Sequence, residues 1–374
     1  MRSMRVLFLT NIPAPYRVDF FNELGKLCKL TVLFERRSAT DRNKEWISDE
    51  AINFKPVFLE GIKVGHDSSF CPSVLQWLQK DRFDIFVIGG YSTPTGMLAI
   101  EYLRLRRIPF FLNVDGGFIK DDKPIVHAIK KHFIGSATWW LSTGNETNRY
   151  LEHYGAKKDR IFIYPFTLIR SSELCPGIAD EYEKVSLRQK LGISGDRVVL
   201  SVGQFIHRKG FDILIKAWKS IPQNITLLIV GGGPDEKKLF SLISEEGLVN
   251  VRLIGFKKKD ELRDYYRAAD LFVLPTREDI WGLVINEAMA CGLPIISTNK
   301  CIAALELVKD GENGFIVPVE DENALVDKVS YIFSDEELLY NMANKSLERV
   351  KAYTIENMAQ VHYNLFVKLE NVIY

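Results

Sequence analysis

One stretch in the last third of the chain reads Thr276-Arg-Glu-Asp-Ile-Trp-Gly-Leu-Val-Ile-Asn-Glu-Ala-Met-Ala-Cys-Gly-Leu-Pro294. The apolar run directly before it, residues 269–275, has the length and β-branched character of a strand buried in a parallel sheet. The residues from Leu283 to Cys291 then predict a helix, because Gly292 supplies a left-handed residue after it and Pro294 prevents its continuation. This order of strand, loop and helix is the repeating unit of an α/β fold.

The start of this predicted helix is suited to bind a phosphate. Its first turn falls near residues 281–284, where backbone N–H groups have no partner within the helix and the helix dipole is positive. These groups can hold an anion without a side-chain cation. Gly282 would let the ligand come close to the backbone.

Two carboxylates flank the helix start. Asp279 precedes the first turn and Glu287 follows eight residues later, so the pair can bracket a ligand that enters there. In the plainer alternative, Asp279 or Glu278 caps the helix and Glu287 is a solvated position. The spacing alone favours that alternative, whereas the Trp-Gly pair after Asp279 and the small residues around Glu287 favour a ligand site.

The segment Glu278-Asp-Ile-Trp-Gly-Leu-Val-Ile-Asn-Glu-Ala-Met-Ala-Cys-Gly-Leu-Pro294 resembles the donor-site motif of the retaining glycosyltransferases of family four, which have the GT-B fold. The resemblance implies a sugar-nucleotide donor, whose sugar and ribose hydroxyls Asp279 and Glu287 would contact. That family more often has Glu at the first acidic position, so Asp279 is a departure. The donor-binding residues expected from the segment are Asp279, Ile280, Trp281, Gly282, Leu283, Val284 and Glu287.

Length and composition set limits on the class of protein. A chain of 374 residues with 47% apolar residues is long enough for two cores. Lys plus Arg number 49 and Asp plus Glu 48, so a net charge of +1 gives no field that would recruit nucleic acid. Five cysteines without C-x-x-C spacing suggest reduced core thiols, and no apolar run suits a signal peptide or a membrane span of about 20 residues. We therefore expect a cytoplasmic protein.

Both halves of the chain alternate apolar runs with helical stretches, which predicts parallel α/β domains. The expected strands are residues 6–9, 30–34, 83–88, 109–114, 138–141, 160–164, 197–203, 225–230, 251–254, 271–274 and 293–297. The irregular stretch 170–180 is the linker candidate. We expect Rossmann-like, doubly wound domains over residues 1–175 and 176–355, with a ligand crevice between them. The resemblance implies that a terminal helix, about 356–374, returns to the N-terminal domain.

A basic loop follows the first strand of the second half. It reads Gly203-Gln-Phe-Ile-His-Arg-Lys-Gly210, and it opens at the edge of the sheet where ligands bind in open α/β folds. Arg208 offers a planar fork and Lys209 a point charge to a diphosphate, although such a pair in a solvated loop is the alternative. By resemblance Lys209 matches the phosphate-binding lysine of the family. Gln204 replaces the usual arginine, for which Arg208 is the substitute.

Two further loops complete the expected donor site. Residues 230–234, Val-Gly-Gly-Gly-Pro, follow a strand, and by resemblance Gly232 and Gly233 lie beside the nucleotide. Gly255 and Phe256 occupy the place where family members present backbone groups to the base. Backbone contacts do not identify that base, so UDP and GDP donors both remain open.

The acceptor is expected on the first half. In Asn113-Val-Asp-Gly-Gly-Phe118, Asp115 stands where many relatives have a histidine, and it would hold a sugar hydroxyl, act as a base, or simply cap the next turn. Loop residues on the same edge are further candidates, although for Arg17 an ordinary surface salt bridge is an equal alternative. The acceptor candidates are Tyr16, Arg17, Tyr91, Asp115 and Gly116.

The resemblance implies retaining transfer without an enzymic nucleophile. Arg208, Lys209 and the helix start would stabilise charge on the leaving diphosphate, while Asp279 positions the sugar. No cofactor and no metal are expected, since the sequence shows no Asp-x-Asp motif. The loop after the first strand lacks Gly-x-Gly-x-x-Gly, which disfavours a dehydrogenase. A sugar-nucleotide epimerase of the same fold and a catalytically silent binding or scaffold protein remain as alternatives.

A basic amphipathic stretch precedes the strand at residue 138. It can lie on an anionic membrane surface, which would suit a lipid-linked acceptor. A helix that faces the core and has a solvated basic side is an equal explanation. The stretch interleaves Lys120, Lys123, Lys130, Lys131 and His132 with Ile125, Val126, Ile129, Phe133 and Ile134.

Overall fold

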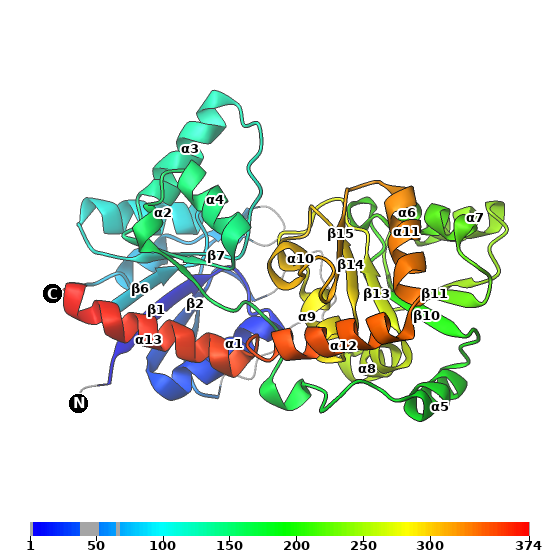
Figure 1. Cartoon of the computed structure of the whole chain (residues 1–374). Coiled ribbons are helices and arrows are strands. Elements are labelled where there is room, and N and C mark those ends of the chain that lie inside the picture. The colour runs from blue at the N-terminus through cyan, green and yellow to red at the C-terminus, as the bar shows by residue number, and fades with distance from the viewer. Residues whose placement is uncertain (1–2, 38–51, 65–67, 374) are drawn as a thin grey trace. The chain divides into compact units, whose positions relative to one another are not determined.

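The computed structural model describes residues 3–37, 52–64 and 68–373. The chain divides into two compact units. Unit 1 comprises Met1–Leu168 together with Thr354–Tyr374, and unit 2 comprises Ile169–Tyr353. Each unit is a parallel sheet covered by helices (Figure 1).

Unit 1 is built on a seven-stranded sheet in the order β3-β2-β1-β6-β7-β8-β9, in which every pair is parallel. The strand order reverses between β1 and β6, the kind of position at which α/β sheets bind ligands. Its strands are β1 (Arg5–Thr10), β2 (Lys29–Phe34), β3 (Lys55–Phe58), β6 (Ile85–Ile88), β7 (Phe111–Val114), β8 (Trp139–Ser142) and β9 (Ile161–Ile163). A separate antiparallel pair, β4 (Ile62–Val64) and β5 (Ser68–Phe70), was not expected, and neither was β3.

The helices of unit 1 cover both faces of this sheet. Leu9, Ile88 and Leu112 share one apolar cluster with Ile100 and Leu103 of α2. The terminal helix α13 packs against α1, so it returns to the first unit as the resemblance implied (Figure 1). These helices are α1 (Pro15–Leu27), α2 (Pro94–Leu105), α3 (Pro124–Gly135), α4 (Asn145–His153) and α13 (Ile355–Ile373), with 3-10 turns at η2 (Pro72–Gln76) and η3 (Lys158–Arg160).

Unit 2 repeats the plan with a six-stranded sheet in the order β12-β11-β10-β13-β14-β15, again parallel throughout. The order reverses between β10 and β13, next to the loop that carries Arg208 and Lys209. All eleven strands expected from both halves are present, and each bound lies within two residues of its predicted position. The strands of unit 2 are β10 (Arg197–Gln204), β11 (Ile225–Gly232), β12 (Val251–Ile254), β13 (Leu271–Leu274), β14 (Ile295–Thr298) and β15 (Gly314–Val317).

Helices cover both faces of the second sheet as well. Leu214, Leu239 and Val329 of α6, α7 and α11 share an apolar cluster with strand residues Leu227 and Val273. The helix α6 ends at Ala217 and continues as a 3-10 turn. The helices are α5 (Glu181–Leu191), α6 (Phe211–Ala217), α7 (Glu236–Glu245), α8 (Lys259–Ala268), α9 (Leu283–Ala290), α10 (Ile302–Leu307), α11 (Glu322–Phe333) and α12 (Glu336–Val350), with 3-10 turns η4 (Ser171–Glu173), η5 (His207–Lys209) and η6 (Trp218–Ser220).

A buried carboxylate joins α5 to the centre of the second sheet. The Asp270 side chain is fully buried, and it accepts ion-paired hydrogen bonds from Lys184 Nζ at 2.6 Å and Arg188 Nη2 at 2.7 Å. The backbone N–H of Val198, at the start of β10, also donates to it at 2.8 Å. Asp270 therefore fixes the helix that opens unit 2 to two neighbouring strands.

The segment expected to be a linker packs within unit 2. The Cys175 N–H donates to the Ala290 carbonyl at 3.0 Å, and Glu173 pairs with Lys259 at 2.5 Å. These contacts place the division between units at Leu168 and Ile169, upstream of the expected boundary at 175/176. The Cys175 and Cys291 sulfurs lie 3.9 Å apart as free thiols.

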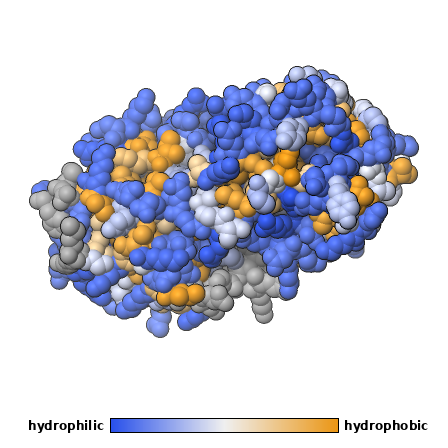
Figure 2. Space-filling model, turned by 60° about the horizontal axis from the view of Figure 1, so that its bottom comes forward, coloured by the Kyte–Doolittle hydropathy of each residue, from blue (hydrophilic) through white to orange (hydrophobic). Residues whose placement is uncertain are grey.

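The surface is mainly polar. On the face shown in Figure 2, apolar side chains lie in small patches separated by hydrophilic residues. Among the residues that the structure describes, no helix has the length and hydropathy needed to cross a bilayer.

Candidate functional site

Two loops meet at the carboxyl edge of the second sheet. The strands β10 and β13 are parallel neighbours, so the loops that follow them leave at the same edge. The Arg277 N–H donates to the Arg208 carbonyl at 2.8 Å, and the Thr276 hydroxyl donates to the same oxygen at 2.9 Å. The basic loop and the stretch around Asp279 are therefore joined by hydrogen bonds.

Three charged side chains gather where these loops meet. The Asp279 carboxylate is buried and pairs with the equally buried Lys209 ammonium and, at 3.3 Å, with Arg208 Nη1. Arg208 is half exposed and also donates to the Glu278 carbonyl at 2.7 Å. Two cations against one carboxylate leave a net positive charge, with Arg208 facing solvent. The cluster can therefore hold an anion of more than one charge.

The helix α9 begins directly after this cluster. Gly282 is its N-cap, with a φ of 99°, and no side chain caps the helix. A Cβ at Gly282 would lie 2.7 Å from the Cys301 sulfur, so a larger residue does not fit. Capping by Asp279 or Glu278 is thus not what the structure shows. Helix bounds and the left-handed Gly292 after it agree with the sequence prediction.

Trp281, one of the expected donor-site residues, has a buried ring, and its indole N–H donates to Asn286 Oδ1 at 2.9 Å. Its carbonyl accepts from the Ala303 N–H at 2.8 Å. The ring therefore supports the start of α9 from within the core. The neighbouring Ile280 side chain is half exposed.

Glu287 lies in the second turn of α9 and is half buried rather than solvated. Burial raises the pKa of its carboxyl to about 6, although a hydrogen bond from Tyr266 and the charge of Lys259 oppose the increase. The Tyr266 hydroxyl donates to Glu287 Oε2 at 2.9 Å. A carboxylate with a raised pKa beside an anion-binding helix start is typical of a functional position.

The glycine-rich loops differ in what they expose. A Cβ at Gly233 would lie 2.6 Å from the Phe205 carbonyl, so this glycine is required by chain packing. Gly232 and Gly255 have no described atom within 4 Å of such a Cβ, which leaves space for a ligand on that side of each glycine. Phe256 is half exposed, and Gln204 is exposed at the end of β10.

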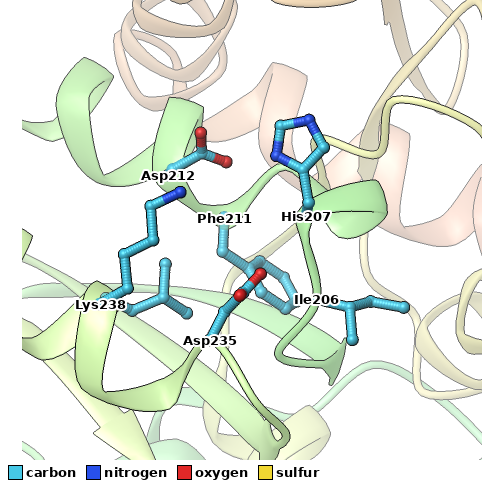
Figure 3. Close-up of a pocket in the computed structure, with 7 residues that line it drawn as sticks. Ile206, His207, Phe211, Asp212, Asp235 and Lys238 are labelled. Atoms are coloured by element: carbon cyan, nitrogen blue, oxygen red, sulfur yellow. The ribbon is translucent and has the colours of Figure 1, made fainter.

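A small pocket lies beside the basic loop, between it and α7 (Figure 3). Its lining includes the carboxylates of Asp212 and Asp235, and the Lys238 ammonium points toward Asp212. None of Arg208, Lys209 and Asp279 lines it. Two carboxylates do not suit a diphosphate, so this pocket is separate from the candidate anion site. The lining residues are Ile206, His207, Phe211, Asp212, Asp235, Lys238 and Leu239.

In unit 1, Asp115 is held by three donors. Arg17 pairs with its carboxylate, while Asn113 Nδ2 and the Tyr164 hydroxyl donate to it at 2.9 Å and 3.0 Å. Arg17 is buried, which corrects the surface salt bridge considered above. Burial lowers the pKa of Arg17, but the Asp115 charge more than offsets this, so the guanidinium is held charged. Asp115 does not act merely as a turn cap.

The other acceptor candidates lie around this group or beside it. The Tyr16 ring packs edge-to-face against the Phe166 ring. The Arg17 guanidinium lies 5.7 Å from the centre of the Tyr16 ring and 5.6 Å from the centre of the Phe166 ring. Gly116 follows Asp115 in the chain. The Tyr91 hydroxyl is instead 2.5 Å from that of Tyr150.

Sequence reasoning missed two partners of Asp115, although a signal for both was present. Asn113 belongs to the quoted strand exit, and Tyr164 ends the apolar run predicted as β9. Strand ends of one parallel sheet meet at one edge, so their polar residues were candidates for a common cluster.

Comparison with known proteins shows what this chain is similar to. Residues 183–349 match the family model described as Glycosyl transferases group 1. A D-inositol 3-phosphate glycosyltransferase of Xylanimonas cellulosilytica is 29% identical over 343 residues, 89% of this chain and 74% of that protein. An uncharacterized glycosyltransferase of Methanocaldococcus jannaschii is 34% identical over 158 residues, 42% of this chain and 44% of that protein. The chain thus spans less than half of the length of the Methanocaldococcus jannaschii protein.

Solved structures show the same architecture. HepE of Anabaena, in complex with UDP, aligns with a TM-score of 0.80 over 98% of this chain and 100% of that chain, at 18% identity. The sucrose-phosphate synthase of Thermosynechococcus elongatus aligns with a TM-score of 0.75 over 99% and 100%, at 20% identity. Two Rossmann-like units with a terminal helix define a protein of the GT-B fold, as predicted. The chain is therefore similar to glycosyltransferases, over residues 183–349 by the family model and over most of its length by the Xylanimonas cellulosilytica protein.

Proposed function

We propose that the chain transfers a sugar from a nucleotide-diphosphate sugar to a saccharide or lipid-linked acceptor, with retention of configuration and without a metal ion, in the assembly of a cell-surface polysaccharide or glycan. The observation that carries this proposal is the cluster of Arg208, Lys209 and Asp279 directly before the first turn of α9. The names of the matched relatives favour sugar transfer over the epimerase and scaffold alternatives.

The cations would act on the leaving group. As the glycosidic bond breaks, negative charge gathers on the diphosphate, and Lys209, Arg208 and the N–H groups of Leu283 and Val284 would stabilise it. The acceptor oxygen would attack from the face that the diphosphate leaves, which retains configuration. A diphosphate oxygen would take the proton of the acceptor hydroxyl. The positive charge of the protein would serve in place of a metal ion.

The carboxylates would position the donor. Each Asp279 oxygen already forms an ion pair with a cation, so a sugar hydroxyl would donate to an oxygen whose direction is fixed. Glu287 would accept from the ribose hydroxyls, and the nucleotide would lie along the open side of Gly232 and Gly255. UDP and GDP both fit a base contacted through the backbone.

On unit 1, we propose Asp115 as the acceptor-side residue. Its carboxylate is about one third exposed and is held by Arg17, Asn113 and Tyr164. A carboxylate so fixed can accept a hydrogen bond from an acceptor hydroxyl. Tyr16 and Gly116 would line the approach to it.

Replacing Glu287 by alanine is expected to weaken nucleotide binding by about 1 kcal/mol or more, because a charged hydrogen-bond acceptor is lost. The measurement is the thermal shift of the full chain with UDP-, GDP- and ADP-sugars, since a ligand that binds the folded state raises its stability. Glu245→Ala at the end of α7 is the control. A folded Glu287→Ala variant with an unchanged shift would remove Glu287 from the donor site.

Stereochemistry and metal dependence are tested on the product. With the donor selected by thermal shift, NMR of the anomeric proton should show the donor configuration in the product. Turnover should persist after chelation with EDTA. An inverted product or a loss of turnover that Mg²⁺ restores would overturn these parts of the proposal.

We also propose that the chain is cytoplasmic and that α3 contacts an anionic membrane surface. Ile125, Val126 and Ile129 expose much of their side chains along this helix, and Lys123 and Lys131 are exposed beside them. Apolar side chains at helical spacing flanked by lysines suit a lipid interface. Five buried free cysteines are in keeping with a reducing compartment.

Replacing Ile125 by glutamate should reduce binding of the chain to anionic vesicles at least severalfold. The change removes an exposed apolar side chain and adds a negative charge, which the anionic lipid repels. The measurement is co-sedimentation with phosphatidylglycerol vesicles. Leu105→Glu is the matched control, since Leu105 is 70% exposed and Ile125 is 69% exposed. Equal loss in both variants, or no loss in Ile125→Glu, would contradict membrane contact through α3.

A further inference from the structure

We propose that Tyr266 is a positioning residue of the donor site, which acts on the nucleotide only through Glu287 by fixing the direction of that carboxylate. The inference rests on the proposed function, because it assumes that Glu287 binds the donor. The resemblance to the family assigns no role to Tyr266, which lies on α8, outside the motif of residues 278–294.

The geometry leaves one carboxylate oxygen for a ligand. The Tyr266 hydroxyl donates to Glu287 Oε2 at 2.9 Å. Within the described part of the chain, Glu287 Oε1 takes no protein hydrogen bond. The tyrosine therefore selects which oxygen faces inward. The other oxygen, Oε1, is left to accept a hydrogen bond from a hydroxyl of the sugar nucleotide.

The tyrosine itself is held in place. It is 97% buried, since its relative exposure is 3%, and its ring packs on Phe272 of β13 with the ring centres 5.8 Å apart. Burial and the nearby Glu287 charge raise the pKa of Tyr266 well above its usual range, so the hydroxyl remains a donor. A fixed donor of this kind is what a positioning residue requires.

Other charged groups face Glu287 but do not fix its direction. Lys259 on α8 lowers the pKa of Glu287 and Glu173 on η4 raises it, and these two residues pair with each other at 2.5 Å. Cys291, one turn further along α9, faces Tyr266. Only Tyr266 donates a hydrogen bond to the carboxylate within the described residues.

This arrangement has a pH signature. The pKa of Glu287 is raised to about 6 in the folded chain, so the charged form that a ligand needs is lost as the pH falls through about 6. The Tyr266 hydrogen bond lowers that pKa. Removing the hydroxyl should therefore raise the pKa further, and nucleotide affinity should begin to fall at a higher pH.

The test compares Tyr266→Phe with Tyr265→Phe, a neighbouring buried tyrosine on the same helix. UDP and GDP are titrated calorimetrically into the full chain between pH 5 and pH 8. We expect Tyr266→Phe to weaken binding about 3- to 30-fold at pH 7, because the Glu287 carboxylate is no longer held in one direction. Its affinity should fall at a higher pH than that of the wild type. Tyr265→Phe should change neither the affinity at pH 7 nor the pH at which the affinity falls.

A Glu287→Gln background separates positioning from a structural effect. If Tyr266 acts through the carboxylate, Tyr266→Phe should have little further effect on affinity in that background and no effect on its pH dependence. An equal loss in both backgrounds, or an unchanged affinity and pH profile in Tyr266→Phe alone, would overturn the proposal. Failure of the wild type to bind either nucleotide would instead overturn the donor site, and this proposal with it.

Discussion

Replacing Lys209 by methionine is expected to lower the rate of sugar transfer by about 10²- to 10³-fold, as removal of a preorganised charge at a developing anion does. The Lys209 ammonium is buried against Asp279, and its aliphatic carbons lie beside Gly203. Methionine preserves that apolar packing and removes only the charge. Asp279 would then retain Arg208, at 3.3 Å, as its single cation.

The measurement is the initial rate of nucleoside diphosphate release with donor and acceptor. Lys238→Met is the control, because Lys238 lines the separate pocket beside the same loop (Figure 3). That variant should transfer at nearly the wild-type rate. A Lys209→Met variant that is folded and keeps more than about one third of the rate would show that its charge does not stabilise the leaving group.

Replacing Asp270 by alanine should destabilise unit 2 by about 3–5 kcal/mol, because it leaves two cations buried without their common partner. Arg188 is itself buried, and Lys184 is largely so. The backbone N–H of Val198 would lose its acceptor as well. The effect should appear as a lower urea midpoint of unit 2, without any direct effect on the donor site.

Asp264→Ala provides the comparison. Asp264 pairs with Lys190 at 2.7 Å, but both side chains are substantially exposed, so we expect a loss of no more than about 1 kcal/mol. Urea unfolding followed by hydrogen exchange of β10 and β13 reports on unit 2 in particular. Similar losses in the two variants would mean that burial of Asp270 does not determine its contribution.

The sequence predicted every strand of the two parallel sheets except two edge strands, β3 and β15. Central strands such as β10 and β13 are continuous apolar runs, because both of their faces are covered by helices. The edge strand β3 is largely exposed and contains a proline, and β15 begins with a glycine. Proline and glycine disfavour a strand, so neither segment was recognised as one.

The donor half of the candidate site was accessible from local sequence, whereas its supporting contacts were not. Asp279, Gly282 and Glu287 lie in one motif, and their spacing relative to a helix start can be read directly. Tyr266 precedes Glu287 by 21 residues and meets it only because the fold brings α8 and α9 within reach of this hydrogen bond. Long-range pairs of this kind depend on packing between elements, which local pattern does not encode.

The acceptor half shows the same limit more strongly. Arg17, Asp115 and Tyr164 come from α1, the end of β7 and the end of β9. Their common feature is position at one edge of a sheet. That edge was predictable, but burial of Arg17 was not, because a lone arginine in a loop is most often exposed.

The return of α13 to unit 1 has a consequence for biosynthesis. Unit 2 is a single contiguous segment, whereas unit 1 needs residues from both sides of it in the chain. A ribosome therefore delivers all of unit 2 before it delivers the helix that covers Phe20 and Phe111 through His362 and Phe366. Until α13 is synthesised, the sheet of unit 1 lacks this helix on one apolar face, while unit 2 can already fold.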